Sequence, residues 1–247
     1  MDKNEIISEF RRIEKLGFVK SKRSHNTGIG KTFEDLLGMS ERSKFNPNFS
    51  ELEIKSKREF THAYITLFTK SPTHPRKANT ILRDYYGEPY IDKPSLKRIN
   101  TSLFATKCNN FCNRFSFMLV NNIDEEKVII IIKDICSGEV IDDTIFWTYE
   151  DLKKCLVKKL KTLFFVSAES KIENDNEFFH YNKAEIYVNP CINKLLALIN
   201  SGKIMVDIRI GSFRSGVKEG KIHDHGTAFR LKLKDLPLLY EEVVKIE

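Results

Sequence analysis

The chain has 247 residues, of which 41% are hydrophobic and 30% are charged. This composition is typical of a folded globular protein and excludes a disordered chain. No apolar run approaches the roughly 20 residues that a membrane-spanning helix needs, and the charged residues 1–5 predict no signal peptide. The five cysteines are odd in number and lack a second Cys/His pair with zinc-finger spacing, so we expect buried or idle thiols in a reducing cytosol.

The net charge of +7 is compatible with a nucleic-acid partner. Basic residues gather next to turn residues in three segments, 20–31, 70–83 and 209–230. We interpret these segments as loops that contact phosphates. Solvated surface charge remains the alternative, because basic clusters are common on soluble proteins.

Hydrophobic spacing predicts the secondary structure in chain order. The first half is expected to hold a helix over 2–16 with Leu16 on its buried face, a loop over 21–30, a helix over 32–37 that ends at Gly38, and strands over 52–55 and 63–68. The middle is expected to hold strands over 115–120, 128–132 and 145–147 at the centre of the sheet, a helix over 149–161, a strand over 163–166 and a helix over 192–199. A strand over 204–210, a loop over 211–226 and a closing strand over 228–233 follow. The pattern predicts a mixed α/β fold with a central sheet flanked by helices.

Residues 28–32, Gly-Ile-Gly-Lys-Thr, resemble the end of a phosphate-binding loop. The full motif requires a glycine five positions before Gly30, and this chain has His25 there. No strongly apolar strand precedes the segment either. The motif therefore does not predict a nucleotide-hydrolysing enzyme.

The most informative chemistry lies at Glu53 and Lys55. Side chains alternate along a strand, so these two project from one face while Leu52 and Ile54 face the core. A carboxylate binds a hard divalent cation, and a nearby lysine orients or deprotonates an attacking water. Such phosphodiesterase sites often add a glutamate from a preceding helix, here Glu34. A Glu-x-Lys strand alone is a weak signal, because a surface ion pair worth under about 1 kcal/mol has the same pattern.

A family resemblance rests on six segments, which are residues 27–37, 47–55, 67–72, 167–173, 206–211 and 223–230. Together they resemble the MvaI/BcnI restriction endonuclease family, which is related to the mismatch-repair nickase MutH. The likeness covers nearly the whole chain, is weakest between Ile91 and Ile145, and is greater to the MvaI branch than to the BcnI branch. Singly, none of the segments is specific.

The resemblance implies a PD-(D/E)xK nuclease fold in one domain, residues 1–247, with two lobes around a DNA cleft. Approximately residues 1–165 would form the catalytic lobe with a minor-groove loop, and residues 166–247 the major-groove recognition lobe. The implied activity is that of a type II restriction endonuclease that cleaves double-stranded DNA as a monomer at a short CC-N-GG type site. Mg²⁺ is the implied cofactor, with Ca²⁺ or Mn²⁺ as substitutes in crystals. A cytoplasmic bacterial enzyme without membrane contact, with a cognate DNA methyltransferase in the host, is implied as well.

By the same resemblance, Glu53 and Lys55 fall on the family's catalytic acid and lysine, and Glu34 falls on its helix glutamate. Asn48 stands where the family has its first metal-binding aspartate. A neutral amide binds Mg²⁺ more weakly than a carboxylate, so this chain is expected to be an inactivated variant. We favour an Asp-to-Asn substitution that traps uncut DNA, because the rest of the motif is intact. A natural loss with Glu51 as the nearest substitute is the other explanation.

The resemblance also assigns residues to DNA recognition. Arginine pairs with guanine O6 and N7, and aspartate accepts from cytosine N4. The major-groove candidates are Asp207, Arg209, His223, His225 and Arg230, and the minor-groove candidates are Tyr64, Lys70, His74 and Arg76. Two alternatives remain open, a structural ion pair between Asp207 and Arg209 and a metal site at His223 and His225.

Two other functions remain open at this point. The chain could be a strand-nicking repair endonuclease similar to MutH, which would leave plasmids as open circles. It could also be a sequence-specific DNA-binding protein that does not cleave, its metal site lost at Asn48.

Overall fold

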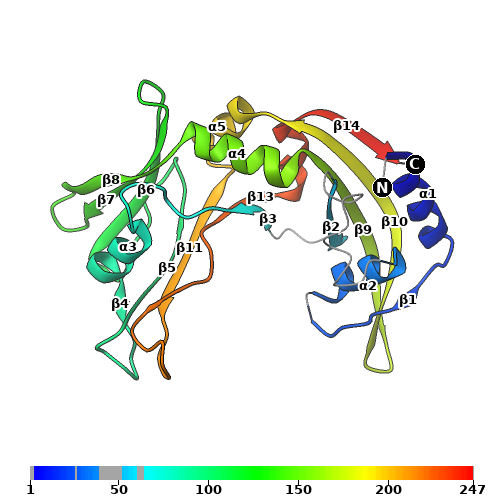
Figure 1. Ribbon diagram of the computed structural model, residues 1–247, viewed down its shortest axis with the longest axis horizontal. Helices are drawn as coiled ribbons and strands as arrows, with labels where there is room; N and C mark the ends of the chain where they lie inside the picture. The colour runs from blue at the N-terminus through cyan, green and yellow to red at the C-terminus, as the bar shows by residue number, and fades with distance from the viewer. Residues whose placement is uncertain (1–2, 26, 39–51, 60–63, 247) are drawn as a thin grey trace. The chain divides into compact units, whose positions relative to one another are not determined.

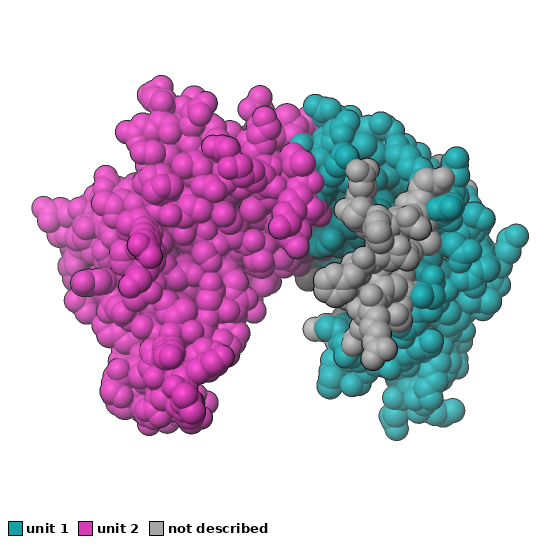
Figure 2. Space-filling view, viewed as in Figure 1, with its two compact units in different colours: residues 1–62, 160–190, 240–247 teal, residues 63–159, 191–239 magenta. Residues whose placement is uncertain are grey.

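The computed structural model describes residues 3–25, 27–38, 52–59 and 64–246 (Figure 1). The chain forms two compact units, each assembled from separated segments (Figure 2). Unit 1 comprises residues 1–62, 160–190 and 240–247, and unit 2 comprises residues 63–159 and 191–239. This division differs from the linear boundary that the sequence led us to expect near residue 165, because two later parts of the chain return to the sheet of the N-terminal segment.

Unit 1 is built on one mixed sheet. Its elements are α1 (Lys3–Glu14), β1 (Val19–Lys20), α2 (Gly28–Leu36), β2 (Leu52–Arg58), β9 (Thr162–Glu173), β10 (Asn176–Pro190) and β14 (Tyr240–Ile246). The strand order is β1-β10-β9-β2, and β14 pairs with β10. β2 runs parallel to β9, whereas β10 is antiparallel to β1, β9 and β14. The predicted mixed α/β class is confirmed.

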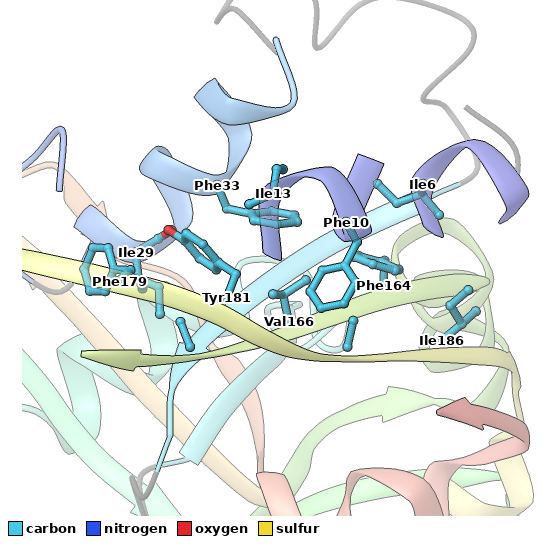
Figure 3. Close-up of a cluster of buried hydrophobic side chains, with 12 residues drawn as sticks. Ile6, Phe10, Ile13, Ile29, Phe33, Phe164, Val166, Phe179, Tyr181 and Ile186 are labelled. Atoms are coloured by element: carbon cyan, nitrogen blue, oxygen red, sulfur yellow. The ribbon is translucent and has the colours of Figure 1, made fainter. Parts of the chain in front are cut away.

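Helices α1 and α2 supply the apolar cover of this sheet (Figure 3). Helical spacing puts Ile6, Phe10 and Ile13 on one side of α1, where all three are buried. The ring of Phe164 on β9 lies 6.1 Å from that of Phe10 and 6.4 Å from that of Phe33 on α2. One face of the sheet is therefore closed off by helices.

Unit 2 contains two sheets. The larger has the order β3-β13-β11-β5-β4, with β12 paired to β11. Its strands are β3 (Tyr64–Thr69), β4 (Glu88–Pro89), β5 (Lys97–Leu103), β11 (Met205–Ser212), β12 (Ile222–Asp224) and β13 (Ala228–Lys232). The smaller is the antiparallel meander of β6 (Phe115–Asn122), β7 (Lys127–Asp134) and β8 (Val140–Thr148). The helices are α3 (Ala78–Tyr86), α4 (Tyr149–Leu160, its last residue counted in unit 1), α5 (Ile192–Asn200) and the 3-10 helix η3 (Leu233–Leu239).

Three element predictions near the N-terminus and in the middle of the chain are wrong. Leu16 lies beyond the end of α1 and is 49% exposed. α2 begins at Gly28, inside the predicted loop, where a Cβ atom would lie 2.3 Å from the carbonyl oxygen of Arg23. Glycine permits this close approach, so a residue that usually signals a loop starts a helix here. The strands predicted at the centre of the sheet form the separate meander.

The C-terminal predictions also need correction. The strand predicted over 228–233 does not close the fold, because η3 and β14 follow it. The predicted loop over 211–226 contains the short strand β12. β5 was not predicted, since only Ile99 and Leu103 are buried apolar residues in its seven positions. None of the helices formed by the described residues is long and apolar enough to span a membrane.

We expect Phe164→Ala to lower the free energy of unfolding by about 3–5 kcal/mol, because truncating a buried aromatic ring leaves a cavity. Ile172 is 77% exposed, so Ile172→Ala should change it by less than about 0.5 kcal/mol. Urea denaturation followed by circular dichroism measures both. A loss for Phe164→Ala as small as that of the control would show that α1 and α2 do not pack on β9.

Candidate active site and nucleic-acid interface

The catalytic candidates of unit 1 stand on β2. Leu52 and Ile54 pack against the buried cluster beneath α1 and α2. Glu53 and Lys55 therefore project from the opposite face of the strand, as the alternation predicts. Lys55 Nζ donates a hydrogen bond to Glu53 Oε1 at 3.2 Å. The strand thus holds one acid and one amine in contact on a single face.

This pair is accessible to a ligand. The side chain of Glu53 is 41% exposed and that of Lys55 is 23% exposed. Lys57 follows two positions later on the same strand, and burial lowers the pKa of its ammonium group. Burial raises the pKa of Tyr240, and the negative charge of Glu53 raises it further. The Glu53 carboxylate is therefore in contact with the Lys55 ammonium group and close enough to the buried Tyr240 phenol to affect its pKa.

Of the remaining catalytic candidates, the structure describes Glu34 alone. Glu34 is half-buried on α2, which packs against β2. Asn48 and Glu51 lie outside the described residues. Within the described ranges, no group of three or more His, Cys, Asp or Glu side chains could hold a metal ion. The catalytic roles of Glu34 and Asn48, like those of Glu53 and Lys55, therefore remain predictions.

A second polar cluster forms on the larger sheet of unit 2. Along β11, Val206, Ile208 and Ile210 are buried, and Asp207 and Arg209 share the opposite face. Asp207 Oδ2 lies 2.9 Å from Arg209 Nε and 3.0 Å from Arg230 Nη2 of the neighbouring β13.

The Asp207 carboxylate is nearly buried beside the two guanidinium groups. Its side chain is only 7% exposed, and Ser102 Oγ donates to its Oδ1 at 3.2 Å. Asp207 Oδ2 has no hydrogen-bond partner among the described residues, so the expectation that Asp207 accepts a hydrogen bond from cytosine stays a prediction. The ion pair left open as the alternative is present. Asp207 forms ion pairs with both Arg209 and Arg230, which leaves a net positive charge on the face.

Open hollows border this cluster. One of about 530 Å³ is lined by Arg209, Arg230 and His225, among other residues of β3, β5, β11 and β13. Another of about 560 Å³ is lined by Asp207 and Arg209 together with residues 100–102 and 109–111. The guanidinium of Arg209 is the most accessible of the cluster, with 52% of its side chain exposed. The face can therefore receive a polar ligand.

The two histidine candidates lie together at the β12 end of the sheet. Their rings are 4.0 Å apart, and the ring of His223 stacks on Phe213 at 4.4 Å. Asp224 between them accepts hydrogen bonds from Ser71 Oγ at 3.0 Å and Asn79 Nδ2 at 2.6 Å, which fix this short strand. Neither histidine belongs to a candidate metal cluster in the part of the chain that is described.

The predicted minor-groove residues differ in how available they are. His74 and Arg76 are exposed, and the ring of His74 stacks on Phe146 at 4.6 Å. Lys70 Nζ lies 3.6 Å from a carboxylate oxygen of Asp151, so part of its charge is neutralised. Tyr64 is half-buried at the start of β3. His74 and Arg76 are therefore the better placed candidates of this group.

Residues of β5 share the polar face and were missed from the sequence. Register pairs Ser102 with Asp207 and Asn100 with Arg209. Arg98 follows on the same face, its guanidinium 5.3 Å from the ring centre of Tyr90. The local signal for a strand at β5 is weak, and only its long-range pairing with β11 reveals these residues.

Comparison with known proteins supports one family. The model of the MvaI/BcnI restriction endonuclease family matches residues 7–240. A solved structure described as a complex of restriction endonuclease MvaI with cognate DNA substrate is 36% identical, with a TM-score of 0.83 and full coverage of both chains. A structure of MvaI without DNA is 37% identical, with a TM-score of 0.68 and coverage of 100% of this chain and 99% of that one. No curated protein matches.

We expect Asp207→Asn to lower the free energy of unfolding by about 1–3 kcal/mol, because it removes the nearly buried negative charge that lies 2.9 Å and 3.0 Å from two guanidinium groups and leaves those two positive charges close together. Asp92→Asn is the control, since its ion pair with Arg214 is largely exposed and should contribute less than about 1 kcal/mol. Chemical denaturation of both variants tests this. Equal stability of the two would mean that Asp207 does not hold the arginines together.

Proposed function

The chain belongs to the MvaI/BcnI restriction endonuclease family, and on this premise we propose that it is a type II enzyme that hydrolyses double-stranded DNA with Mg²⁺. We further propose that it acts as a cytoplasmic monomer at a CC-N-GG type site, which a cognate methyltransferase protects in the host genome. The observation that carries the catalytic part is the contact between Glu53 and Lys55 on an accessible face of β2.

The residues present fit a magnesium ion. Mg²⁺ keeps several water ligands and commonly binds through one or two carboxylates and a substrate phosphate. Glu53 supplies one accessible carboxylate, and Glu34 on the adjoining helix is the candidate for a further acidic contact. When bound, the ion supplies charge neutralisation at the phosphate and a more acidic water.

Lys55 completes the chemistry from the protein side. Its ammonium group lies 3.2 Å from Glu53 Oε1. It can therefore also contact a water molecule or a phosphate that is held beside this carboxylate. There it can orient the attacking water and stabilise negative charge that develops on the phosphate oxygens. Lys57 adds positive charge on the same strand. These residues act on the phosphate and read no base sequence.

Sequence recognition is proposed for unit 2. Arg209 and Arg230 can each pair with guanine O6 and N7 in the major groove. Because Asp207 already fixes both guanidinium groups, less side-chain freedom is lost when DNA binds. His223 and His225 extend the same face, and His74 and Arg76 are candidates for phosphate or minor-groove contacts. The MvaI complex with its cognate DNA supports double-stranded DNA as the ligand.

Asn48 favours a second candidate function, in which the protein binds its DNA sequence and does not cleave it. An amide at the first metal-ligand position lacks the charge that Mg²⁺ binding requires of a carboxylate. Both candidates share the same DNA-binding face, so they differ only in catalysis.

Asn48→Asp is expected to raise the rate of Mg²⁺-dependent plasmid linearisation by more than about 100-fold, because it restores a charged metal ligand. The same change combined with Lys55→Ala serves as the control and should remain inactive. Gel electrophoresis of the plasmid distinguishes linear from open-circular product. An Asn48→Asp protein that binds Mg²⁺ and the cognate duplex but leaves the plasmid intact would favour the non-cleaving candidate.

Arg230→Ala is expected to weaken binding to the cognate duplex by about 1–3 kcal/mol and to random duplex much less, because a lost guanine contact affects only the specific complex. Lys234, an exposed residue of η3, provides the control, and Lys234→Ala should leave the ratio of the two affinities unchanged. Fluorescence anisotropy at one fixed salt concentration measures both. Equal losses on both duplexes would remove Arg230 from the recognition residues.

A further inference from the structure

Lys57 shares the face of β2 that carries the acid and the lysine of the candidate active site. The two residues that flank it face the other way. Ser56 Oγ lies 3.5 Å from the position that a Cβ atom of Gly30 on α2 would take. The Arg58 guanidinium lies 5.2 Å from the ring centre of Phe179, which belongs to the buried cluster beneath α1 and α2. Because side chains alternate along a strand, the half-buried Lys57 projects from the face opposite α2.

The sheet beside Lys57 is hollowed on this face. The parallel register of β2 and β9 pairs Lys55 with Phe165 and Lys57 with Ser167. Phe165 and Ser167 both line a hollow of about 340 Å³, together with Lys183 of β10 and other residues of unit 1. A ligand that reaches the candidate active site can therefore extend along β2 towards Lys57.

The charges around Lys57 suit an anionic ligand. The nearest acid before it in the chain, Glu53, contacts Lys55, and the nearest acid after it, Glu59, forms an ion pair with Lys183. Both carboxylates are thus partly neutralised and repel an approaching phosphate less strongly. Burial removes water from the Lys57 ammonium group and lowers its pKa, so less water has to be displaced when an anion binds.

We propose that Lys57 binds the phosphate next to the scissile one on the same DNA strand. Residues two positions apart in a parallel strand lie about 6.6 Å apart. Neighbouring phosphates of one DNA strand are about 3.4 Å apart along the helix axis and about twice as far apart through space, because the backbone winds around that axis. Lys55 and Lys57 therefore match two successive phosphates.

This inference rests on the proposed function, because it requires that Glu53 and Lys55 lie at the scissile phosphate. It adds a substrate contact with a separate role. Lys57 holds the neighbouring phosphate and so sets the position of the DNA strand along β2, while Lys55 acts on the phosphate that is cleaved. A point charge on a phosphate selects no base, so this contact is independent of the DNA sequence.

The test measures binding of the full chain, in Ca²⁺, to a duplex that it selects from a pool of random-sequence DNA. Lys57→Ala and Lys57→Gln both remove the charge and should weaken binding by about three- to tenfold. They should also reduce the slope of the logarithm of the binding constant against the logarithm of the salt concentration by about 0.9. Lys57→Arg keeps the charge and should keep this slope. Lys15→Ala is the control, an exposed lysine that follows α1, and should change neither quantity.

Copies of the selected duplex that carry one methylphosphonate each then locate the contact, because this group removes the negative charge of a single phosphate. The loss caused by Lys57→Ala should disappear at one modified position. That position should be immediately next to the one at which the loss caused by Lys55→Ala disappears.

Failure of the assignment and failure of the proposed function give different results. The assignment of Lys57 is wrong if its neutral variants bind as tightly as the unaltered chain, or if their loss persists at every modified position. It is also wrong if the loss disappears at the same phosphate as that of Lys55→Ala or at a phosphate that is not its neighbour. In each of these cases a defined position for Lys55 still supports the proposed function. If the chain selects no sequence, or if Lys55→Ala has no such position, the proposed function fails and the assignment fails with it.

Discussion

The parallel pairing of β2 with β9 is the constraint on which the catalytic account depends. Seven consecutive residues of β2, from Leu52 to Arg58, pair in register with β9. Leu52 and Ile54 enter the core beneath α1 and α2, so Glu53 and Lys55 must face the other way. A slip of one residue would bury the charged pair and expose the apolar one, which the hydrophobic core strongly opposes. Packing of apolar side chains thus positions the polar chemistry.

The polar face of unit 2 follows the same logic on another sheet. The even-numbered residues of β11 from 206 to 210 are buried, and this fixes Asp207 and Arg209 on the accessible side. Asp207 then holds arginines from β11 and β13, so residues far apart in the chain form one rigid group. A surface ion pair contributes little to stability, but a nearly buried carboxylate between two guanidinium groups fixes their orientation. Orientation is what recognition of a base edge requires.

Sequence reasoning succeeded where the controlling pattern is local. The spacing of Ile6, Phe10 and Ile13 predicts α1, and the alternation at residues 52–55 predicts which side chains share a face. The family resemblance and the chemistry of a carboxylate assign Asp207 to a base, but the sequence does not show that Arg230 of the adjacent strand lies 3.0 Å from it. The sequence likewise gives little sign of β5, whose pairing with β11 places Asn100 beside Arg209. Long-range strand register depends on the folded chain and leaves a weak local signature. The unit division eluded prediction for this reason too, since β9, β10 and β14 rejoin the first segment through strand pairing.

A crystal structure of the chain with a cognate duplex and Ca²⁺ tests the central claim most directly. The account predicts a cation about 2.3–2.6 Å from both a Glu53 carboxylate oxygen and an oxygen of one backbone phosphate, with Lys55 Nζ within hydrogen-bond distance of that phosphate or of a water beside it. A complex in which duplex DNA is bound while Glu53 and Lys55 face bulk solvent, with no phosphate near them, would contradict it.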